Sequence, residues 1–378
     1  MGTYFDNAAT TMVRTEAVEA MLRVLRDSFG NPSSMHSCGR QAKAELEMAR
    51  KSIADAIGAQ PENICFTSGG TESNNLAILG ISDSLKHKGR HIITSAIEHS
   101  AVLDPVKKLQ SSGWEVTYLL PDPAGRIPAA AFSDALRDDT VLASVMLVNN
   151  ETGAVNPVGE YKSEIRRRKL NTVLHTDAVQ GFCKIPFSVK STGAELVTVS
   201  SHKIHGPKGS GALYIKDGIK LKPLILGGSH EKGTRGGTEA LPAAAGFGEA
   251  ARLGVLELED TALLVRDLRD GLLTKLRAGI PGVVVIGEGD SPFLLCISLP
   301  GHKSEILMNF LDSEGFCVSS GAACKKGARS RTLEAMQLKN EVIDGALRIS
   351  FSRYNTHDEA ERFVSVLKRG SETVLKAL

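Results

Sequence analysis

Lys203 lies in the stretch SSHKIHGPKG, residues 200–209, between a histidine and a glycine-rich turn. The residues before it, ELVTVS, are largely apolar and β-branched, which is typical of a buried strand. An ammonium group is costly to bury, so a lysine at the end of such a strand is either paired or kept neutral as a nucleophile. Lys203 is therefore the first candidate for chemistry.

A glycine turn, SGGTES at residues 68–73, follows the apolar stretch NICFT. A glycine turn that opens a helix leaves free backbone N–H groups at the positive end of the helix dipole, and Thr71 and Ser73 add hydroxyl groups. The motif predicts an anion site, with a plain glycine-containing helix cap as the alternative.

Further polar residues follow other strand-like stretches: His99 in EHSAV, Asn150 in NNETG and Asp177 in DAVQG. His99 could cap a helix or stack on a planar ligand. Asp177 at a buried strand end needs a cationic or hydrogen-bonding partner. That partner is either an arginine elsewhere or a protonated pyridine nitrogen, whose charge makes the ring an electron sink.

The elements that must position these residues alternate between strands and helices from about residue 60 to 215. Residues 71–86, 99–112 and 158–169 carry apolar residues at helical spacing, and seven short apolar stretches between about residues 60 and 215 resemble strands. Such alternation predicts a mainly parallel α/β sheet covered by helices on both faces, with ligands at the carboxyl ends of its strands. An anion cradle, an imidazole, an amide, an acid and a lysine would then meet in one cofactor site.

Residues 16–28 and 40–57 are predicted to be helices that lead into this sheet, and residues 240–279 a long helix that leaves it. A smaller α/β unit follows, with GVVVIG, FLLCISLP, FCVSS and ALRISFS as strands, and with helices over 303–313 and from 357. We predict a large domain over 14–255 and a small domain formed by 1–13 and 256–378.

The composition favours a soluble globular protein, with 378 residues of which 42% are hydrophobic and 23% charged. A net charge of +2 gives no overall attraction to nucleic acid or to a membrane. No apolar stretch approaches the roughly 18 residues of a membrane span, and no secretory signal is visible. The six cysteines form no CxxC pair or zinc-spaced cluster. We therefore expect a cytoplasmic protein with reduced thiols and no metal site.

Nine stretches resemble, in order and spacing, the NifS/IscS-like cysteine desulfurases, pyridoxal-phosphate enzymes of the class V aminotransferase group. They are YFDNAATT, GNPSS, FTSGGTESNN, EHSAVLD, VNNETG, HTDAVQG, SSHKIHGPKG, TRGGTE and SSGAAC, and the resemblance extends from residue 3 to about 365. It implies fold type I of the pyridoxal-phosphate-dependent transferases and a homodimer. It also implies conversion of L-cysteine to L-alanine, with the sulfur transferred to an enzyme cysteine as a persulfide.

The resemblance also implies how the cofactor is held. Lys203 would be the Schiff-base lysine, Asp177 would bind the pyridine nitrogen, Gln180 the phenolic oxygen of the ring, and His99 would stack on the ring and transfer protons. The residues implied to hold the phosphate are Gly70, Thr71, Ser200 and His202, together with Thr238 of the second subunit. Asn150 and Arg348 would bind the substrate carboxylate, and Asn150 would also contact the cofactor.

Cys324, in SSGAACKKGARSRT, aligns with the nucleophile of the family. The cations Lys325, Lys326, Arg329 and Arg331 follow it. Nearby positive charge favours a thiolate, and we expect it also to attract an acidic acceptor protein, with a plain solvated loop as the alternative. Many members carry CTxxxxEPS here, whereas this loop is shorter and lacks Glu-Pro. The departure favours a dedicated acceptor, such as a tRNA thiolation enzyme, over a general iron–sulfur scaffold protein.

The other cysteines have plainer interpretations. Cys65, Cys183, Cys296 and Cys317 lie in or beside predicted strands and are expected to be small core residues, whereas Cys38 is expected to be exposed.

Two alternatives remain open at this point. Another class V enzyme, such as a selenocysteine lyase or an aminotransferase for a small amino acid, would share Lys203 and Asp177 but need no loop cysteine. A catalytically inactive homologue retained as a binding partner would form no covalent bond with the cofactor.

Overall fold

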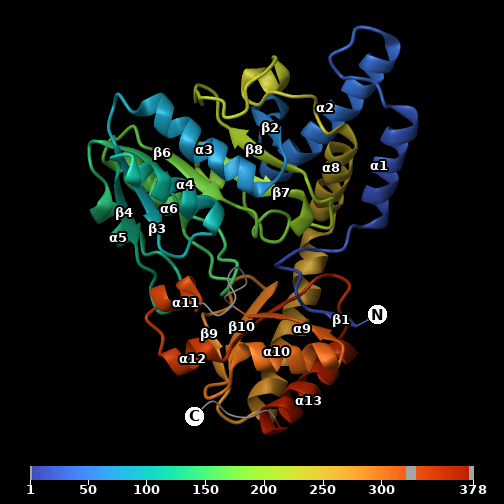
Figure 1. Ribbon diagram of the computed structural model, residues 1–378, viewed down its shortest axis with the longest axis vertical. Coiled ribbons are helices and arrows are strands. Elements are labelled where there is room, and N and C mark those ends of the chain that lie inside the picture. The colour runs from blue at the N-terminus through green and yellow to red at the C-terminus, as the bar shows by residue number, and fades with distance from the viewer. Residues whose placement is uncertain (1, 321–328, 374–378) are drawn as a thin grey trace.

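The computed structural model of the chain describes residues 2–320 and 329–373. Its elements form an upper part around a seven-stranded sheet and a lower part around a smaller sheet (Figure 1). The long helices α8 (Leu241–Leu256) and α9 (Leu258–Gly279) follow one another from the upper part into the lower part (Figure 1). None of the helices in the described part of the chain has the length and hydropathy of a membrane span.

The large sheet is mainly parallel, as predicted, and all seven predicted strands are present. They are β2 (Ile64–Thr67), β3 (His91–Ser95), β4 (Glu115–Leu119), β5 (Thr140–Ser144), β6 (Val173–Asp177), β7 (Leu196–Ser200) and β8 (Gly211–Ile215). Their order is β2-β8-β7-β6-β5-β3-β4. Strand β8 alone runs against its neighbours β2 and β7. The carboxyl ends of β5, β6 and β7 therefore point the same way, toward one edge of the sheet.

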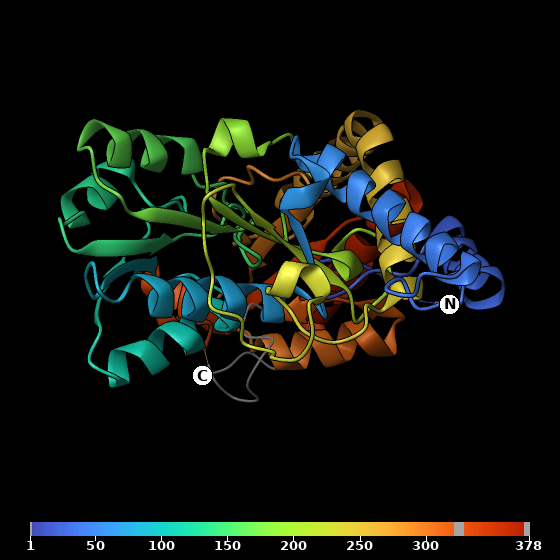
Figure 2. The ribbon, with the colours of Figure 1, turned by 90° about the horizontal axis from the view of Figure 1, so that it is seen from above.

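Helices cover both faces of the large sheet (Figure 2). On one face lie α3 (Gly70–Leu85) and α4 (Ser100–Ser111), and the other is covered by α2 (Ser37–Ile57), α6 (Val158–Arg167) and α8. The short helices α5 (Ala129–Ala135) and α7 (Val189–Thr192) pack beside α6. The remaining helix of the upper part, α1 (Thr15–Asp27), packs on α8.

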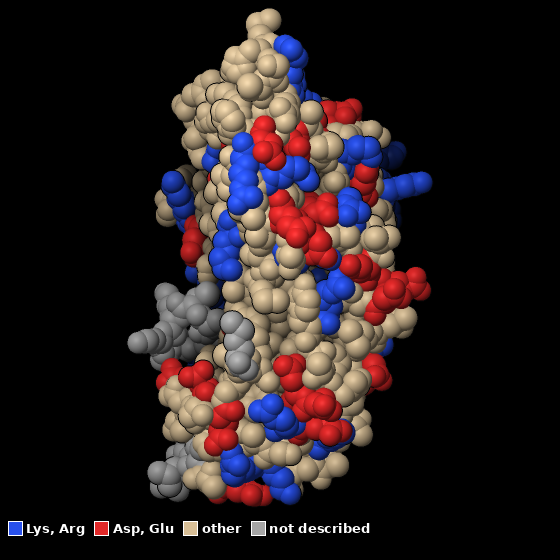
Figure 3. All heavy atoms as spheres, turned by 90° about the vertical axis from the view of Figure 1, so that its right-hand side faces the viewer, with Lys and Arg blue, Asp and Glu red and all other residues tan. Residues whose placement is uncertain are grey.

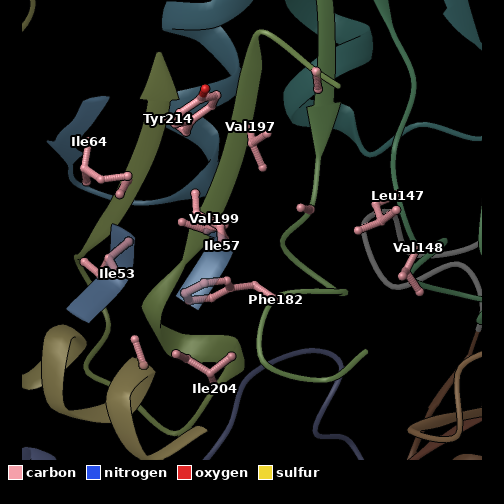
Figure 4. Close-up of a cluster of buried hydrophobic side chains, with 14 of the residues drawn as sticks. Ile53, Ile57, Ile64, Leu147, Val148, Phe182, Val197, Val199, Ile204 and Tyr214 are labelled. Carbon is pink, nitrogen blue, oxygen red and sulfur yellow. The ribbon is translucent and has the colours of Figure 1, made fainter. Parts of the chain in front are cut away.

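Successive side chains of a strand point to opposite faces of the sheet, so the hydrophobic core is divided between these two faces. Leu196 of β7 packs with the α3 and α4 side, whereas Val197 and Val199 pack on the other side with Ile53 and Ile57 of α2 (Figure 4). Each of these side chains is at most 1% exposed. Burying an aliphatic side chain of this size contributes about 1.5–3 kcal/mol, so the two-sided burial holds the strand ends in fixed positions.

The predicted helix over 240–279 is instead two helices, because Glu257 between α8 and α9 leaves the helical conformation at φ −102° and ψ 5°. The carboxylate of Glu257 accepts hydrogen bonds from Arg14 at 3.1 and 3.2 Å and also pairs with Arg353. The break therefore coincides with an ionic junction between three distant segments, which helical periodicity alone could not reveal.

The smaller sheet is antiparallel, in the order β12-β13-β10-β9. Its strands are β9 (Val284–Ile286), β10 (Leu294–Ser298), β12 (Ser319–Ser320) and β13 (Ala346–Ser350). The helices of this part are α10 (Ser304–Ser313), α11 (Arg331–Ala335), α12 (Asn340–Asp344) and α13 (His357–Thr373).

The N-terminal residues belong to the lower part of the molecule. Strand β1 (Thr3–Tyr4) pairs in parallel with β11 (Phe316–Cys317). The ring of Phe5 lies 5.5 Å from that of Phe351 and 5.6 Å from that of Phe363. Ala8, in contrast, packs into the core of the large sheet. The division into 14–255 and 1–13 with 256–378 stays a prediction.

Charges on the surface are mixed. On the face in Figure 3, Lys and Arg side chains alternate with Asp and Glu side chains over both parts of the molecule. This face therefore has no broad region of one sign, in keeping with the net charge of +2.

Candidate active site

A cavity of about 390 Å³ lies at the N-terminus of α3. Gly70, Thr71, Ser200 and His202 line it, as predicted from the sequence. The hydroxyl of Ser200 is buried and has no hydrogen-bond partner among the described residues. A buried hydroxyl without a partner is unfavourable, and the first N–H groups of a helix are free to bind an anion. The cavity thus has the properties of a phosphate cradle.

Ser73 does not take part in this cradle, although its hydroxyl was a candidate. Its Oγ lies 2.7 Å from Oγ1 of Thr67, and Ser73 is fully buried and does not line the cavity. The helix turns its side chain back toward β2. Thr71 and Ser200 remain as the hydroxyls of the cradle.

Two glycines let the backbone close around the cradle. A Cβ at Gly70 would lie 2.9 Å from Cγ2 of Val179, and a Cβ at Gly211 would lie 2.6 Å from Cα of Gly69. Position 211 therefore requires glycine if β8 is to lie this close to the start of α3, whereas a side chain at position 70 would press on Val179 in the turn after β6. Sequence reasoning missed Gly211, although a glycine at the start of the strand GALYI is a recognisable signal of close backbone approach.

Lys203 ends a short 3-10 helix, Ser201–Lys203, directly after β7. Its Nζ donates to the carbonyl oxygens of Ala8 at 2.6 Å and Ala9 at 2.7 Å. Thr11 fixes this approach, because its N–H and its hydroxyl both donate to the carbonyl of His202 at 2.9 Å. The N-terminal segment thus forms part of the site, which the sequence did not indicate.

Asp177, the last residue of β6, is 6% exposed. Its Oδ2 accepts from Nδ2 of Asn74 at 2.7 Å, and its Oδ1 accepts from the backbone N–H of Val179 at 3.0 Å. No arginine of the described residues pairs with it, so the arginine alternative is wrong for this part of the chain. Asn74 was missed; its place on the buried face of α3, one turn after Gly70, was the available signal.

Gln180, three residues further on, is buried between two segments. Its Nε2 donates to the carbonyl of Ala8 at 2.9 Å, and its Oε1 accepts from Nζ of Lys184 at 3.1 Å. Ala8 therefore accepts hydrogen bonds from both Gln180 and Lys203, which places these two predicted residues side by side.

His99 is the N-cap of α4, so the capping alternative from the sequence is correct. Its Nδ1 accepts from the backbone N–H of Ala101 at 3.1 Å, which leaves the proton of the neutral ring on Nε2. Burial lowers the pKa of His99, the charges of Lys203 and Arg331 lower it further, and the charge of Asp177 opposes them. The ring is accordingly held neutral, with its N–H at a known atom.

His202 lies between the cradle and the N-terminal segment. Its Nδ1 is 3.1 Å from Oγ1 of Thr10. Burial lowers the pKa of His202 to about 4, and the charge of nearby Lys203 adds to the effect. A neutral imidazole at this position can donate one hydrogen bond and accept another.

Arg348, on β13, comes from the lower part of the molecule and is 3% exposed. Its Nη1 donates to the backbone carbonyl of Asn150 at 3.0 Å and its Nη2 to Oδ1 of Asp6 at 2.9 Å. The Nε atom is buried and has no partner among the described residues. The structure thus brings the two predicted carboxylate ligands together and adds Asp6, which the sequence did not identify.

Comparison with known proteins decides the family. Residues 3–363 match the aminotransferase class-V family. The chain is 40% identical over 368 residues to cysteine desulfurase IscS of Methanosarcina thermophila, covering 96% of this chain and 90% of the relative. A solved structure of a NifS-like protein has a TM-score of 0.92 at 35% identity, covering 98% of this chain and 99% of the other. SspA, solved in complex with cysteine, has a TM-score of 0.81 at 34% identity, covering 94% of this chain and all of the other, 100%.

The chain belongs to the class-V aminotransferase family and, within it, to the IscS/NifS-like cysteine desulfurases. The predicted family, fold class and desulfurase activity are thereby confirmed. Membership implies pyridoxal phosphate as the cofactor of this desulfurase.

The residues present fit that cofactor. The unpartnered hydroxyl of Ser200 and the start of α3 suit a phosphate, and the buried carboxylate of Asp177 has no arginine as a partner among the described residues. In the described part of the chain no group of His, Cys, Asp and Glu side chains could hold a metal ion. The side chains of this desulfurase are thus arranged for an organic phosphate.

Thr238 does not line the cradle of its own chain. It is exposed, in the segment between β8 and α8, and Arg235 in the same segment donates to Oε1 of Glu72 on α3 at 2.9 Å. The predicted reach of Thr238 into a second subunit of the desulfurase stays a prediction.

Cys324, Lys325 and Lys326 lie outside the described residues. Of the two other cations that follow Cys324 in the sequence, Arg329 pairs with Asp344 at 2.7 Å and Arg331 donates to Oγ of Ser100 at 3.1 Å, next to His99.

The burial of the other cysteines matches the prediction in part. Cys65 and Cys296 are buried in strands, and burial raises the pKa of Cys296 to about 12, so these two thiols of the desulfurase are core residues. Cys317 is only partly buried in β11, and Cys183 is partly buried in the turn after β6 with a left-handed φ of 53°. Cys38 is exposed, as predicted.

Proposed function

We propose that this desulfurase binds pyridoxal phosphate at Lys203 and converts L-cysteine to L-alanine, passing the sulfur to Cys324. The observation that carries the proposal is the Ser200 hydroxyl, which lines the cavity at the start of α3 without a partner among the described residues, three residues before the half-buried Lys203. A pyridoxal-phosphate enzyme needs a site for the phosphate and an amine for the aldehyde, and the relative SspA was solved in complex with cysteine.

Each cofactor contact has a candidate residue. Asp177 would bind the pyridine nitrogen, Gln180 the ring oxygen, and Lys203 the aldehyde carbon. The phosphate ligands would be Gly70, Thr71, Ser200 and His202, with Thr238 of a second subunit. When bound, pyridoxal phosphate supplies an electron sink for the bond that breaks at the substrate's α-carbon.

Arg348 would bind the carboxylate of L-cysteine, assisted by Asn150. A planar guanidinium can pair with both oxygens of a carboxylate, and the Nε–H of Arg348 is a donor that no described residue uses. The hydrogen bonds from Nη2 to Asp6 and from Nη1 to the Asn150 carbonyl hold the guanidinium group of Arg348 in one orientation. The substrate is thereby oriented before any chemistry begins.

His99 would stack on the cofactor ring and hold a proton at Nε2, close to the substrate. Because Nδ1 already accepts from Ala101, the neutral ring presents its Nε2–H as a hydrogen-bond donor to the bound substrate. Low basicity from burial keeps this ring from retaining a second proton near neutral pH.

Cys324 would receive the sulfur. Its thiolate attacks the sulfur of bound L-cysteine, an S–S bond forms as the C–S bond breaks, and a persulfide remains on the enzyme. The carbon skeleton takes up a proton and leaves as L-alanine. We further propose a cytoplasmic homodimer that delivers the persulfide to an acceptor protein, either an iron–sulfur scaffold or a thiolation enzyme.

The test compares wild type with Lys203→Ala and Cys324→Ala after incubation with pyridoxal phosphate and removal of the excess. Wild type is expected to show a visible absorption band and to form alanine from L-cysteine. Lys203→Ala is expected to lose the band, and Cys324→Ala to keep the band but lose alanine formation by orders of magnitude.

Two results would contradict the proposal. Keto-acid formation in place of alanine, undiminished in Cys324→Ala, would identify an aminotransferase. A wild-type protein without a visible band would identify an inactive homologue.

A further inference from the structure

A second lysine, Lys184, is buried next to the site and has no role in the proposed reaction. It lies in the turn after β6 and is 6% exposed. Its Nζ donates to Oε1 of Gln180 at 3.1 Å, Nε2 of Gln180 donates to the carbonyl of Ala8 at 2.9 Å, and that carbonyl also accepts from Lys203 at 2.6 Å. A continuous series of hydrogen bonds therefore connects Lys184 with Lys203.

Lys184 differs from an ordinary buried lysine in its partner. Lys162, also buried at 8% exposure, forms an ion pair with Glu195 at 2.5 Å. No carboxylate of the described residues lies within ion-pair distance of Lys184, and its hydrogen bond goes to a neutral amide. A buried amine without a counter-ion is costly, so a purely structural role would be filled better by an apolar side chain.

The hydrogen bond from Lys184 and the bond to the carbonyl of Ala8 together set the orientation of the Gln180 amide. An ammonium group only donates hydrogen bonds, so it must face the oxygen end of the amide. With Oε1 held by Lys184, the N–H end points to Ala8 and keeps a second N–H for another acceptor. If the amide were reversed, Oε1 of Gln180 would face the oxygen of such an acceptor, and the two oxygens would repel each other.

We propose that Lys184 is a positioning residue that fixes Gln180 with an N–H toward the ring oxygen of the cofactor. The proposal rests on the function proposed above, since it assumes pyridoxal phosphate in the site. The N–H of Gln180 would stabilise negative charge on that oxygen and so lower the proton affinity of the nitrogen of Lys203 bound to the cofactor.

The groups that the structure describes around Lys184 include several cations and do not supply it with a carboxylate of its own. It shares a cavity of about 40 Å³ with Lys203, Arg14, His205, Glu257 and Arg353, and Glu257 is already paired with both arginines. Burial, together with the charges of Lys203 and Arg348 and opposed by Cys183, lowers the pKa of Lys184 to about 7. The neutral amine still has N–H groups that can donate to Oε1, and the carbonyl of Ala8 accepts from Nε2 in either state, so the orientation of Gln180 persists on either side of neutral pH.

The experiment follows the visible absorption band of the holoenzyme as a function of pH. Lys184→Met replaces the donor with an apolar side chain of similar length. The midpoint of the spectral titration is expected to rise by about one pH unit, because the N–H of Gln180 would no longer be held in its hydrogen bond to the charged ring oxygen of the cofactor. Lys162→Met is the matched control, because it removes a buried lysine that pairs with Glu195 and not with Gln180, and it is expected to leave the midpoint unchanged.

A double-mutant cycle tests whether Lys184 acts through Gln180. Gln180→Met alone is expected to raise the midpoint, and adding Lys184→Met should raise it no further. An unchanged midpoint in Lys184→Met, or a full additional shift in the double variant, would overturn the proposal. If Lys184→Met does not fold, Lys184→Gln takes its place in the cycle, and an additional shift on the Gln180→Met background again overturns it.

The failure of the two proposals can be told apart. A wild-type protein that shows no band with pyridoxal phosphate would remove the proposed function. A normal wild-type band that does not respond to Lys184→Met would remove only the role of Lys184.

Discussion

Asn74 donates from Nδ2 to Oδ2 of Asp177 at 2.7 Å, and this bond joins the first turns of α3 to the end of β6. The helix that forms the phosphate cradle and the strand that carries the buried acid are thereby fixed to one another. Asn74 is 1% exposed, so water cannot replace it.

Asn74→Ala is expected to reduce the free energy of unfolding by about 2 kcal/mol, because it removes a hydrogen bond to a buried charged group. Urea unfolding of the apoprotein measures this change. Asn75→Ala is the matched control, since the amide of Asn75 donates to the carbonyl of Thr71 in its own helix and has no hydrogen bond to Asp177. Equal losses in the two variants would show that the contact with Asp177 is unimportant.

Gly211→Ala is expected to destabilise the protein by about 1–3 kcal/mol and to weaken binding of pyridoxal phosphate, because its Cβ would lie 2.6 Å from the backbone of Gly69. Gly271→Ala serves as the control. That glycine lies in the middle of α9 with no atom near its added Cβ, so the change should stabilise by about 0.5–1 kcal/mol. Cofactor affinity that survives in Gly211→Ala would contradict the close-approach argument.

Arg348→Lys is expected to raise KM for L-cysteine about 10- to 100-fold while the visible band persists, because lysine lacks the planar fork. Steady-state alanine formation measures KM. Arg353→Lys is the control, as Arg353 pairs with Glu257 away from Asn150. A KM that does not respond to Arg348→Lys would place the substrate carboxylate elsewhere.

Acid is expected to destabilise the protein through its buried histidines. Burial lowers the pKa of His175 to about 3 and that of His202 to about 4, below the ordinary value of 6.5. Between these values the unfolded chain binds more protons than the folded chain, so the free energy of unfolding rises with pH. This stability is fully present above about pH 6.5 and is lost as the pH falls toward 3.

Urea unfolding at several pH values from about 4.5 to 6.5 measures this slope. In His175→Gln the slope is expected to decrease by up to about 1.4 kcal/mol per pH unit, the contribution of one proton. A slope that is the same in wild type and variant would show that His175 is protonated in the folded state.

The strands, most of the helices and the polar residues that follow the strands could be predicted from the sequence. Lys203, Asp177 and the turn before α3 were found because strand and helix periodicity are local, and because ligands collect at the carboxyl ends of parallel strands. The resemblance to the desulfurases added the roles of these residues, since nine motifs share one order along the chain.

The groups that contact these residues could not be predicted, because they come from distant parts of the chain. Asn74 lies 103 residues from Asp177, and Asp6 lies 342 residues from Arg348, so no local pattern could pair them. The break at Glu257 and the series of bonds from Lys184 to Lys203 likewise depend on segments that meet only when both sheets have formed. Periodicity specifies which face of an element is buried, whereas the partner on that face depends on how distant elements pack together.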